Sequence, residues 1–515
     1  MRKGWGSTAV TARTPRPYQR EGIQAIRRSL LEGHRAPLYV APTGAGKTFM
    51  FCIVAASGVR HRKRVCVVVH RQELLGQTSR ALDDMGLAHG LIAPGITPAP
   101  REFVQVAMIE TLRRRLEQGR TGAAFDMLVL DEGHHATARQ YGRVLTAQPT
   151  AKILGVTATP ERLDGHGLGT EFGGVYDDLI LGPTTESLMA DGYLCRAEVF
   201  IPPALVDLEG VHMRGGDYAG SEIASRMDKP QITGDAVEHY GRICPGAPAI
   251  AFCASVAHAH HVAQQFRAAG WRSDSIDGDL PDGQRRQRIR DLAEGRLQVL
   301  TSCDIISEGT DIPVVSAAIL LRPTESLALH LQQIGRVLRP VYAQGFDLGT
   351  RDGRLASIAA SQKPSAIVID HVGNMKHGFP EEPRDWTLAG RPRRGRKSES
   401  APSLRVAQCP ECFRAHSPAP QCPSCGHTYE ATVRAPQMVS GELVQVTAEE
   451  KIALAQQRVE QAREVGRATT LEQLEAIARA RGYKQAWARH VFQSRQRQRA
   501  FAATPVPNIY PPTRR

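Results

Sequence analysis

The chain has 515 residues, 42% of them apolar, and a formal net charge of +13. This length allows about three domains, and the apolar content excludes a chain that is disordered throughout. No apolar run reaches about 18 residues and the first residues lack the apolar core of a signal peptide, so we expect a cytoplasmic protein with no membrane partner.

The first predicted element is a helix that follows residues 14–20. Ile23, Ile26 and Leu30 recur at helical spacing and share one face. Gln19 lies in the stretch that precedes this helix, shortly before a glycine-rich loop. Its amide is both a donor and an acceptor, so Gln19 can pair with the Watson–Crick-like edge of adenine. We expect it to bind the base of a nucleotide.

A strand, a glycine-rich loop and a helix come next and together predict a phosphate cradle. The apolar run 37–41 leads into Ala41-Pro-Thr-Gly-Ala-Gly-Lys-Thr48, and a helix-like run follows at 49–56. Glycines allow the backbone N–H groups of such a loop to approach phosphate oxygens at the helix N-terminus. The spacing matches the Walker A pattern except that Ala41 takes the first glycine position, and Thr48 would bind Mg²⁺. The residues expected to bind the nucleotide are Thr43, Gly44, Ala45, Gly46, Lys47 and Thr48.

Two adjacent carboxylates end a buried apolar strand at 128–130. Asp131 can hold Mg²⁺, and Glu132 can polarise the water that attacks the γ-phosphate. A pair of acids in such a place also occurs as a solvated turn. The loop at 41–48 favours the catalytic interpretation, so we expect ATP and Mg²⁺ as cofactors and Lys47, Asp131 and Glu132 as catalytic residues.

Apolar runs alternate with helix-like segments through the first third of the chain. The apolar runs lie at 65–69, 103–107, 127–130 and 153–156, and the helix-like segments include 72–82 and 111–118. Continuous apolar strands between helices indicate a parallel sheet buried on both faces, so we predict an α/β lobe that ends near residue 182. After the last strand, Thr157 and Thr159 either couple nucleotide state to domain position or cap a turn.

A second set of apolar runs predicts a second lobe without a phosphate loop of its own. These runs lie at 249–252, 298–301, 317–321 and 366–370, and residues 183–246 before them lack periodicity. Arg336 and Arg339 are three apart, so on one helix they share a face. They form a solvated stripe or, as we favour, a pair inserted into the nucleotide site of the first lobe. Arginine there stabilises charge on the transferred phosphoryl group.

In this order the motifs resemble those of superfamily-two helicases and translocases, over residues 15–370. Gln19 is similar to the Q motif, 44–48 to motif I, 70–74 to motif Ia, 131–134 to motif II, 157–159 to motif III, 252–255 to motif IV, 301–313 to motif V and 332–339 to motif VI. Gly133 departs from motif II, where the family usually has alanine. The resemblance implies two RecA-like lobes in tandem that close on ATP and Mg²⁺.

The resemblance also implies roles for residues of the second lobe. Gln332, Arg336 and Arg339 of motif VI would be catalytic. Gly309 and Asp311 of motif V would contact the nucleotide.

The same resemblance implies a nucleic-acid partner. Arg71, Ser255 and Thr301, from motifs Ia, IV and V, would hold the nucleic-acid backbone. The likeness is closer to RadD-type DNA repair helicases and their phage relatives, through residues 322–332, 370–374 and 481–487 and a four-cysteine module. It implies a single-stranded-DNA-binding protein as a further partner.

Four cysteines in the last quarter of the chain predict a zinc centre. Cys409 and Cys412 form one C-x-x-C turn, and Cys422 and Cys425 form another. Two such turns place four thiolates at the corners of a tetrahedron, which Zn²⁺ accepts in a closed structural site without a water position. A redox pair is the alternative, disfavoured by the paired turns. Metal binding should be coupled to folding of the module.

Most of the net positive charge lies after Trp386, which indicates a polyanionic partner beside an ATPase. Residues 471–479 are amphipathic, and Tyr483, Lys484 and Trp487 interleave aromatic and cationic side chains that suit base stacking. Helix packing explains these aromatics equally well. The Pro-rich end, 504–515, is expected to be disordered.

The sequence thus predicts an α/β protein whose tandem lobes are followed by a zinc-ribbon-like module and a basic helical tail. The parts are lobe 1 at 1–182, a connector with an insertion at 183–246, lobe 2 at 247–385, a basic linker at 386–404, the zinc module at 405–430 and the tail at 431–515. We expect an ATP-dependent DNA helicase or translocase that works on single-stranded or forked DNA in repair or recombination. The alternatives are a phage replication or restriction-system motor, an RNA helicase, or a non-motor recruitment protein, which would not need the catalytic groups.

Overall fold

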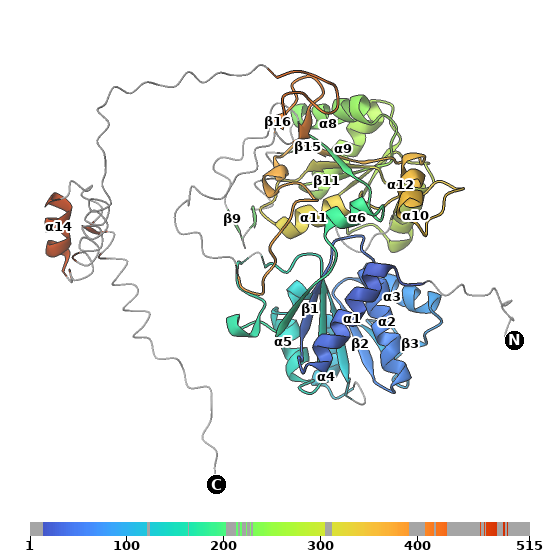
Figure 1. The fold of residues 1–515 in the computed structure, drawn as a ribbon, viewed down its shortest axis with the longest axis vertical. Helices are drawn as coiled ribbons and strands as arrows, with labels where there is room; N and C mark the ends of the chain where they lie inside the picture. The colour runs from blue at the N-terminus through green and yellow to red at the C-terminus, as the bar shows by residue number, and fades with distance from the viewer. Residues whose placement is uncertain are drawn as a thin grey trace, which may run out of the picture. The chain divides into compact units, whose positions relative to one another are not determined.

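The computed structural model describes most of the chain between residues 14 and 492. The described residues are 14–120, 124–162, 164–201, 213–214, 217–218, 223, 227, 230–303, 312–390, 407–416, 419–429, 464, 468, 470–480, 488–489 and 492. The chain divides into two compact units, Met1–Glu430 and Ala431–Arg515. The first unit contains two α/β lobes and the cysteine module (Figure 1).

A seven-stranded parallel sheet forms the centre of the first lobe, in the order β3-β4-β2-β5-β6-β1-β7. Its strands are β1 (Pro37–Val40), β2 (Val65–Val69), β3 (His89–Ile92), β4 (Val104–Met108), β5 (Met127–Asp131), β6 (Lys152–Thr157) and β7 (Asp178–Leu181). The register pairs Leu38 with Gly155 and Val67 with Val129. All carboxyl ends of the strands therefore lie at one edge, where the predicted motifs follow them.

Side chains alternate along these strands between two cores. On β2, Val65, Val67 and Val69 join one core, whereas Cys66 and Val68 join the other. The first core is covered by α1 (Pro17–Leu31), α2 (Lys47–Arg60) and α3 (Gln72–Asp84), and the second by α4 (Ile109–Glu117) and α5 (Arg139–Thr146) (Figure 1). Both faces are buried, which is why the strands read as continuous apolar runs.

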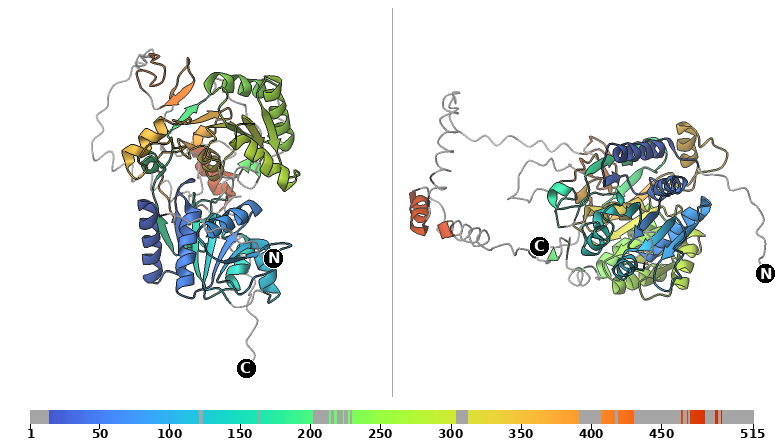
Figure 2. Two further views of the ribbon diagram at one scale, coloured as in Figure 1. Left: turned by 90° about the vertical axis from the view of Figure 1, so that its right-hand side faces the viewer. Right: turned by 90° about the horizontal axis from the view of Figure 1, so that it is seen from below.

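An eight-stranded sheet forms the second lobe, in the order β12-β13-β11-β14-β15-β8-β17-β16. Figure 2 shows this lobe, coloured from green to orange, in two further views. Its parallel strands are β8 (Ala197–Phe200), β11 (Ala249–Cys253), β12 (Ser273–Ile276), β13 (Val299–Ser302), β14 (Ala317–Leu321) and β15 (Ala366–Asp370). The helices of this lobe are α8 (Pro230–Ile243), α9 (Val256–Ala268), α10 (Asp282–Ala293), α11 (Leu327–Gly335) and α12 (Arg351–Ala359). A short hairpin of β9 (Met213–Arg214) and β10 (Asp217–Tyr218) stands apart from the sheet.

The cysteine module extends this second sheet. Its hairpin consists of β16 (Ala407–Gln408) and β17 (Arg414–His416), and β17 pairs antiparallel with β8. Strand β8 comes from the range 183–246, for which the sequence predicts a connector, and it pairs in parallel with β15. The module therefore satisfies the edge of β8, whose backbone N–H and C=O groups an open sheet would leave unpaired.

The described residues trace two of the passages of the chain between the lobes. After β7 it forms α6 (Thr185–Ala190) and reaches the second lobe, where the Cys195 N–H donates to the Leu338 carbonyl at 2.7 Å. After β15 it returns to the first lobe, where the Leu388 carbonyl accepts from the Leu168 N–H at 2.8 Å. Trp386, at the start of the predicted basic linker, packs with Leu388 against the second core of the first lobe.

The helix expected to carry both motif VI arginines ends before them. Helix α11 stops at Gly335, Arg336 is its C-cap, and Arg339 lies beyond it, so the expectation of a shared helical face is wrong. Pro340 gives the reason. A helix that continued through Pro340 would lose an N–H donor and set the ring against the Arg336 carbonyl, and a residue before proline disfavours the helical region.

In the second unit, the described residues contain α14 (Leu471–Ala480), which confirms the amphipathic helix expected at 471–479. Its buried residues belong to a small core of Ala468, Leu474, Ile477, Ala478 and Ala488. Within the described residues of both units, no helix is both long enough and apolar enough to cross a membrane.

Candidate active site and cysteine centre

The loop between β1 and α2 has the backbone of a phosphate cradle. Gly44 and Gly46 have φ angles of 90° and 78°, in the left-handed region that glycine adopts without strain. Gly46 is the N-cap of α2, whose first N–H groups have no partner within the helix. Thr48 lies in the first turn of the same helix. This arrangement of N–H groups at a helix N-terminus fits a phosphate group.

Lys47 lies over the same loop. Its Nζ donates to the Ala41 carbonyl at 3.0 Å and to the Pro42 carbonyl at 3.2 Å. Burial lowers the pKa of the Lys47 ammonium, and the carboxylates of Glu132 and Asp131 oppose that shift. A phosphate in the cradle would stabilise the ammonium further, so the electrostatics of the loop fit an anionic ligand.

The two predicted catalytic acids lie at the end of β5, at the carboxyl edge of the sheet: Asp131 is its last residue and Glu132 follows it. Asp131 is only 6% exposed, and its Oδ1 accepts the Glu132 N–H at 3.0 Å. Gly133 comes next, where a Cβ would lie 2.6 Å from the Tyr176 hydroxyl. That hydroxyl donates to the Gly133 carbonyl at 2.7 Å. Glycine takes the place of the usual alanine of motif II because the buried Tyr176 hydroxyl occupies the space that an alanine methyl group would need.

Motifs II and III contact each other through a histidine and a threonine. His134 Nδ1 lies 3.0 Å from Thr157 Oγ1 and 3.5 Å from Glu132 Oε2. The Thr157 hydroxyl in turn donates to the Thr159 carbonyl at 3.0 Å. The turn after β6 therefore lies beside the acids, while a role in coupling nucleotide state to domain position stays a prediction.

Motif VI of the second lobe approaches the phosphate loop closely. A Cβ on Gly335 would overlap the side chain of Thr43, so the backbone of motif VI lies directly on motif I. A Cβ on Gly44 would lie 3.7 Å from Arg339 Cγ. The first and second lobes are therefore in contact at the phosphate loop.

The predicted catalytic groups of both lobes gather at this contact. Arg336 and Arg339 lower the pKa of Lys47, so both guanidinium groups act on the ammonium of the phosphate loop. Arg336 is 8% exposed, and Gln332 on α11 is 4% exposed. The result is a cationic site with two carboxylates, which suits the binding and cleavage of a phosphoanhydride.

Gln19 lies against the phosphate loop. Its Nε2 donates to the Ala45 carbonyl at 3.0 Å, and its Oε1 accepts the Arg16 N–H at 3.0 Å. The amide thus holds α1 against the loop, and its pairing with adenine stays a prediction.

Tyr193 is a neighbour of the loop that the sequence analysis missed. Its ring lies between Arg16 and Arg354, whose guanidinium carbons are 4.8 and 4.0 Å from the ring centroid. Tyr18 meets the same ring edge-on at 5.2 Å and donates its hydroxyl to the Ala45 carbonyl. These residues come from α1, the inter-lobe passage and α12, and no sequence spacing relates them. Their stacking joins the two lobes beside the phosphate loop.

The residues expected to hold nucleic acid have different surroundings. Arg71 is the N-cap of α3, and Ser255 is the N-cap of α9, with its Oγ accepting the His258 N–H at 3.1 Å. Thr301 is fully buried, and its hydroxyl donates to the Ala259 carbonyl at 2.7 Å. Thr301 therefore fixes β13 to α9 and presents no side-chain surface here. The predictions for Gly309, Asp311, Tyr483, Lys484 and Trp487 lie outside the described residues.

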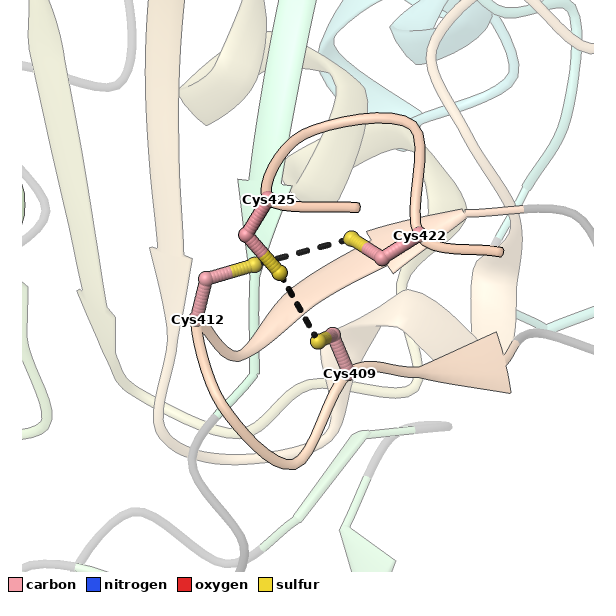
Figure 3. Close-up of side chains that lie close together, drawn as sticks. All are labelled: Cys409, Cys412, Cys422 and Cys425. Carbon is pink, nitrogen blue, oxygen red and sulfur yellow. Dashed lines mark hydrogen bonds between the residues drawn. The ribbon is translucent and has the colours of Figure 1, made fainter. Parts of the chain in front are cut away.

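The four predicted zinc ligands lie together (Figure 3). Their sulfur atoms face one another and lie within 4.8 Å of one another. The Sγ atoms of Cys409 and Cys425 are 3.5 Å apart, and those of Cys412 and Cys422 are 3.6 Å apart. Tetrahedral Zn²⁺ with Zn–S distances of about 2.3 Å needs sulfur atoms about 3.8 Å apart. The donor set and its spacing fit Zn²⁺.

Two protein families match the two lobes. The family described as the res subunit of type III restriction enzymes matches residues 13–162, and the helicase conserved C-terminal domain matches residues 235–341. The first range contains the phosphate loop and both acids, and the second contains Arg336 and Arg339.

Individual proteins show the same likeness. A 51.5 kDa protein of Lactococcus phage (isolate 7-9) is 30% identical over 395 residues, which cover 76% of this chain and 77% of that protein. IRC3 of Saccharomyces cerevisiae, named as an ATP-dependent helicase, is 27% identical over 63% of this chain and 49% of its own length. The chain therefore spans about half of that yeast relative.

The fold is also found among solved structures. A fragment named as the HsdR subunit of a type I restriction enzyme from Vibrio vulnificus YJ016 has a TM-score of 0.53 and 17% identity, covering 72% of this chain and 68% of that one. At this identity the likeness is one of fold. Together with the family matches and the motif order, it shows that the chain belongs to the superfamily-two helicases, as a nucleic-acid-dependent ATPase with two RecA-like lobes.

Proposed function

We propose that this protein is a DNA motor that acts in DNA repair or recombination. The observation that supports it most directly is the approach of Gly335 and Arg339 of the second lobe to Thr43 and Gly44 of the phosphate loop. The first lobe binds the nucleotide, and the second lobe supplies the remaining groups of the site. Bound nucleotide therefore favours closure of the two lobes. Hydrolysis then releases that closure, and repeated closure is how binding energy becomes movement along a strand.

Each polar group of the site has a place in this proposal. Lys47 and the N–H groups of the loop bind the phosphates, and Glu132 orients the attacking water. Arg336 and Arg339 stabilise the charge that develops on the γ-phosphate. Thr48 and Asp131 are the residues that would hold Mg²⁺. When bound, Mg²⁺ supplies neutralisation of the phosphate charge.

Further roles are proposed for residues near this centre. Gln332, buried on the helix that precedes Arg336, orients the groups around the γ-phosphate, and Gln19 supports the base. Gly309 and Asp311 of motif V complete the nucleotide site from the second lobe. Lys47→Ala tests the proposed role of the phosphate loop, because it removes the ammonium over the loop and introduces only a methyl group. ATP turnover should be lost while the fold is kept.

DNA is proposed as the nucleic acid because of two features in the last quarter of the chain. The basic surplus after Trp386 suits a polyanion, and the four-cysteine module resembles that of RadD-type repair helicases. The tail from Ala431 onward is proposed to bind DNA or a single-stranded-DNA-binding protein. Removing residues 431–515, the second compact unit, should weaken that binding and leave the ATP site intact.

A second candidate is the motor of a phage or restriction system. It is favoured by the match of residues 13–162 to the restriction res family and by the phage relative. Such a translocase moves along intact duplex, so its ATP turnover should grow with duplex length. A repair helicase should respond instead to single strands and forks of the same length.

The experiment is steady-state ATP hydrolysis by the zinc-loaded full chain at one salt concentration. Matched single-stranded DNA, duplex, forked DNA and RNA are compared with no nucleic acid. We expect single-stranded or forked DNA to stimulate turnover most. Equal or greater stimulation by RNA would contradict the choice of DNA, and stimulation by long duplex alone would favour the restriction-type motor.

A further inference from the structure

A buried lysine in the second lobe is not used by any motif. Lys363, on the turn between α12 and β15, is only 1% exposed. Its Nζ donates to three backbone carbonyls, those of Pro313 at 2.9 Å, Arg339 at 2.7 Å and Val315. Burying an ammonium costs free energy unless all three of its N–H donors have acceptors. The three carbonyls supply these acceptors, which raises the question of what the buried charge does.

The three carbonyls belong to segments of the nucleotide site. Pro313 and Val315 lie at the end of motif V and just after it, and Arg339 ends motif VI. Helix α11 stops at Gly335, so the Arg339 carbonyl has no place in a helical hydrogen-bond pattern. It is held instead by Lys363 and, more weakly, by the Cys195 thiol at 3.9 Å. Lys363 is thus the strong anchor of the Arg339 backbone.

That anchor lies behind the side chain that reaches the phosphate loop. A Cβ on Gly44 would meet Leu194 Cδ2 at 2.8 Å and Arg339 Cγ at 3.7 Å, so the Arg339 side chain lies against the phosphate loop. Arg339 lies on a backbone segment that no helix holds. If this backbone could rotate freely, the guanidinium would spend less time in the position needed for catalysis. Fixing the carbonyl of Arg339 from inside the second lobe provides that restraint.

We propose that Lys363 is a positioning residue that ties motif V to motif VI and holds Arg339 in place against the phosphate loop. The inference rests on the proposed catalytic role of Arg339. Loss of the Lys363 ammonium should therefore reduce turnover of bound ATP more than the binding of ATP, because the loop that binds the phosphates is in the other lobe.

The charge state of Lys363 makes this role visible in a pH profile. The ionisable groups that act on it are the Cys195 thiol and the Arg339 guanidinium, and burial lowers its pKa to about 8. An ammonium has three N–H donors for three carbonyls, whereas a neutral amine has two. Below about pH 8 all three carbonyls are held, and above it one of them is released.

The test compares Lys363→Met with Arg339→Ala, the double variant and wild type. We expect Lys363→Met to lower kcat for DNA-stimulated ATP hydrolysis by about tenfold, with the KM for ATP within about threefold of wild type. In the Arg339→Ala background the same change should have little further effect on kcat. Lys152→Met is the matched control, because Lys152 also donates to a backbone carbonyl, that of His34, but far from the site.

A purely structural lysine would behave differently. It would lower kcat by the same factor with and without Arg339, or lower only the melting temperature, and either result would overturn the proposal. If Arg339→Ala itself keeps full turnover, the proposed role of Arg339 is lost. If Arg339→Ala is inactive and Lys363→Met is not, only the role of Lys363 is lost.

The pH profile decides the matter if Lys363→Met does not fold. Wild-type kcat should fall as the pH rises through about 8, and the ratio of wild type to Arg339→Ala should shrink over the same range. Taking the ratio removes the titration of groups on which Arg339 does not act. A ratio that stays constant from pH 7 to 9 would overturn the proposal.

Discussion

At the scale of single residues, the site depends on places where a side chain is absent. Gly335 leaves room for Thr43, and Gly133 leaves room for the Tyr176 hydroxyl. In both places the neighbour is part of a buried or inter-lobe contact that cannot move without cost. The identity of these glycines therefore matters as much as the identity of the charged groups near them.

Gly335→Ala should separate motif VI from the phosphate loop. The added methyl group would overlap Thr43, so the lobes must part slightly and Arg339 must withdraw. We expect kcat for ATP hydrolysis to fall by about tenfold or more, equivalent to about 1.4 kcal/mol in the barrier. Gly76→Ala on α3, where a Cβ meets nothing within 4 Å, is the control and should keep wild-type turnover. Equal kcat values for the two variants would contradict this account of the contact.

Gly133→Ala should destabilise the first lobe by about 1–3 kcal/mol because the methyl group meets the Tyr176 hydroxyl. Tyr176→Phe removes that hydroxyl and its hydrogen bond, at a cost of about 1 kcal/mol. The double variant should be more stable than Gly133→Ala alone, since the remaining neighbours lie 3.1 Å away. Urea unfolding of the three variants measures this. A double variant whose loss equals the sum of the single losses would show that the two residues do not interact.

At the scale of elements, the cysteine module is part of the second sheet. Strand β17 pairs with β8, Arg414 forms an ion pair with Glu198 at 3.2 Å, and the Phe413 ring lies under Arg242. A module too small for its own core thus gains order from two sources, the metal and the sheet. Loss of the metal should therefore weaken the pairing of β17 with β8, and loss of this pairing should weaken metal binding.

Removing the metal should therefore expose the backbone amides of β8 to solvent. Chelation, or Cys412→Ser, should increase amide hydrogen exchange in residues 197–200, because the outer partner strand is released. The centre of the first sheet, residues 65–69, is the internal control and should stay protected. Unchanged exchange in β8 after complete metal loss would mean that β17 holds its place without the metal.

The sequence predicted the central strands and missed the edges. The runs at 65–69 and 317–321 are apolar throughout because both faces are buried, and they form β2 and β14. Strands β3, β7, β8 and β12 have four residues each and carry polar side chains, so only their pairing with neighbours makes them strands. The pairing of the cysteine module with β8 likewise depends on contacts between distant residues.

The candidate site was predicted in the same uneven way. Local patterns identified the phosphate loop, the acids and the four cysteines, because each depends on spacing within a few residues. Lys363 and Tyr193 were missed because their partners come from separate elements. The helix over Arg339 was predicted wrongly because the spacing of the two arginines fits a helix, whereas Pro340 disfavours one there. The domain limits and the site roles stay predictions.

At the scale of the first unit, the two lobes meet away from the nucleotide site as well. Arg285 of α10 forms an ion pair with Glu73 of α3 at 2.8 Å. Glu73 belongs to the segment 70–74 that resembles motif Ia, the motif expected to contact nucleic acid. The pair is partly exposed, so it contributes about 0.5–1 kcal/mol and weakens with salt.

Glu73→Arg should open the lobes and raise the KM for ATP, because like charges replace the pair. Exchanging the two residues, Glu73→Arg with Arg285→Glu, should restore both the lobe contact and the KM. Small-angle scattering without nucleotide gives the separation of the lobes, and steady-state kinetics give the KM. An exchange variant that stays as open as the single variant would show that the ion pair does not hold the lobes.

The most direct test of the central claim is DNA-stimulated ATP turnover by Arg339→Ala beside wild type and Lys152→Met. The claim is that the second lobe completes the ATP site through Arg339. It predicts that Arg339→Ala binds ATP normally and loses at least about a hundredfold in kcat, while Lys152→Met matches wild type. Wild-type turnover by folded Arg339→Ala would contradict a site shared between the lobes.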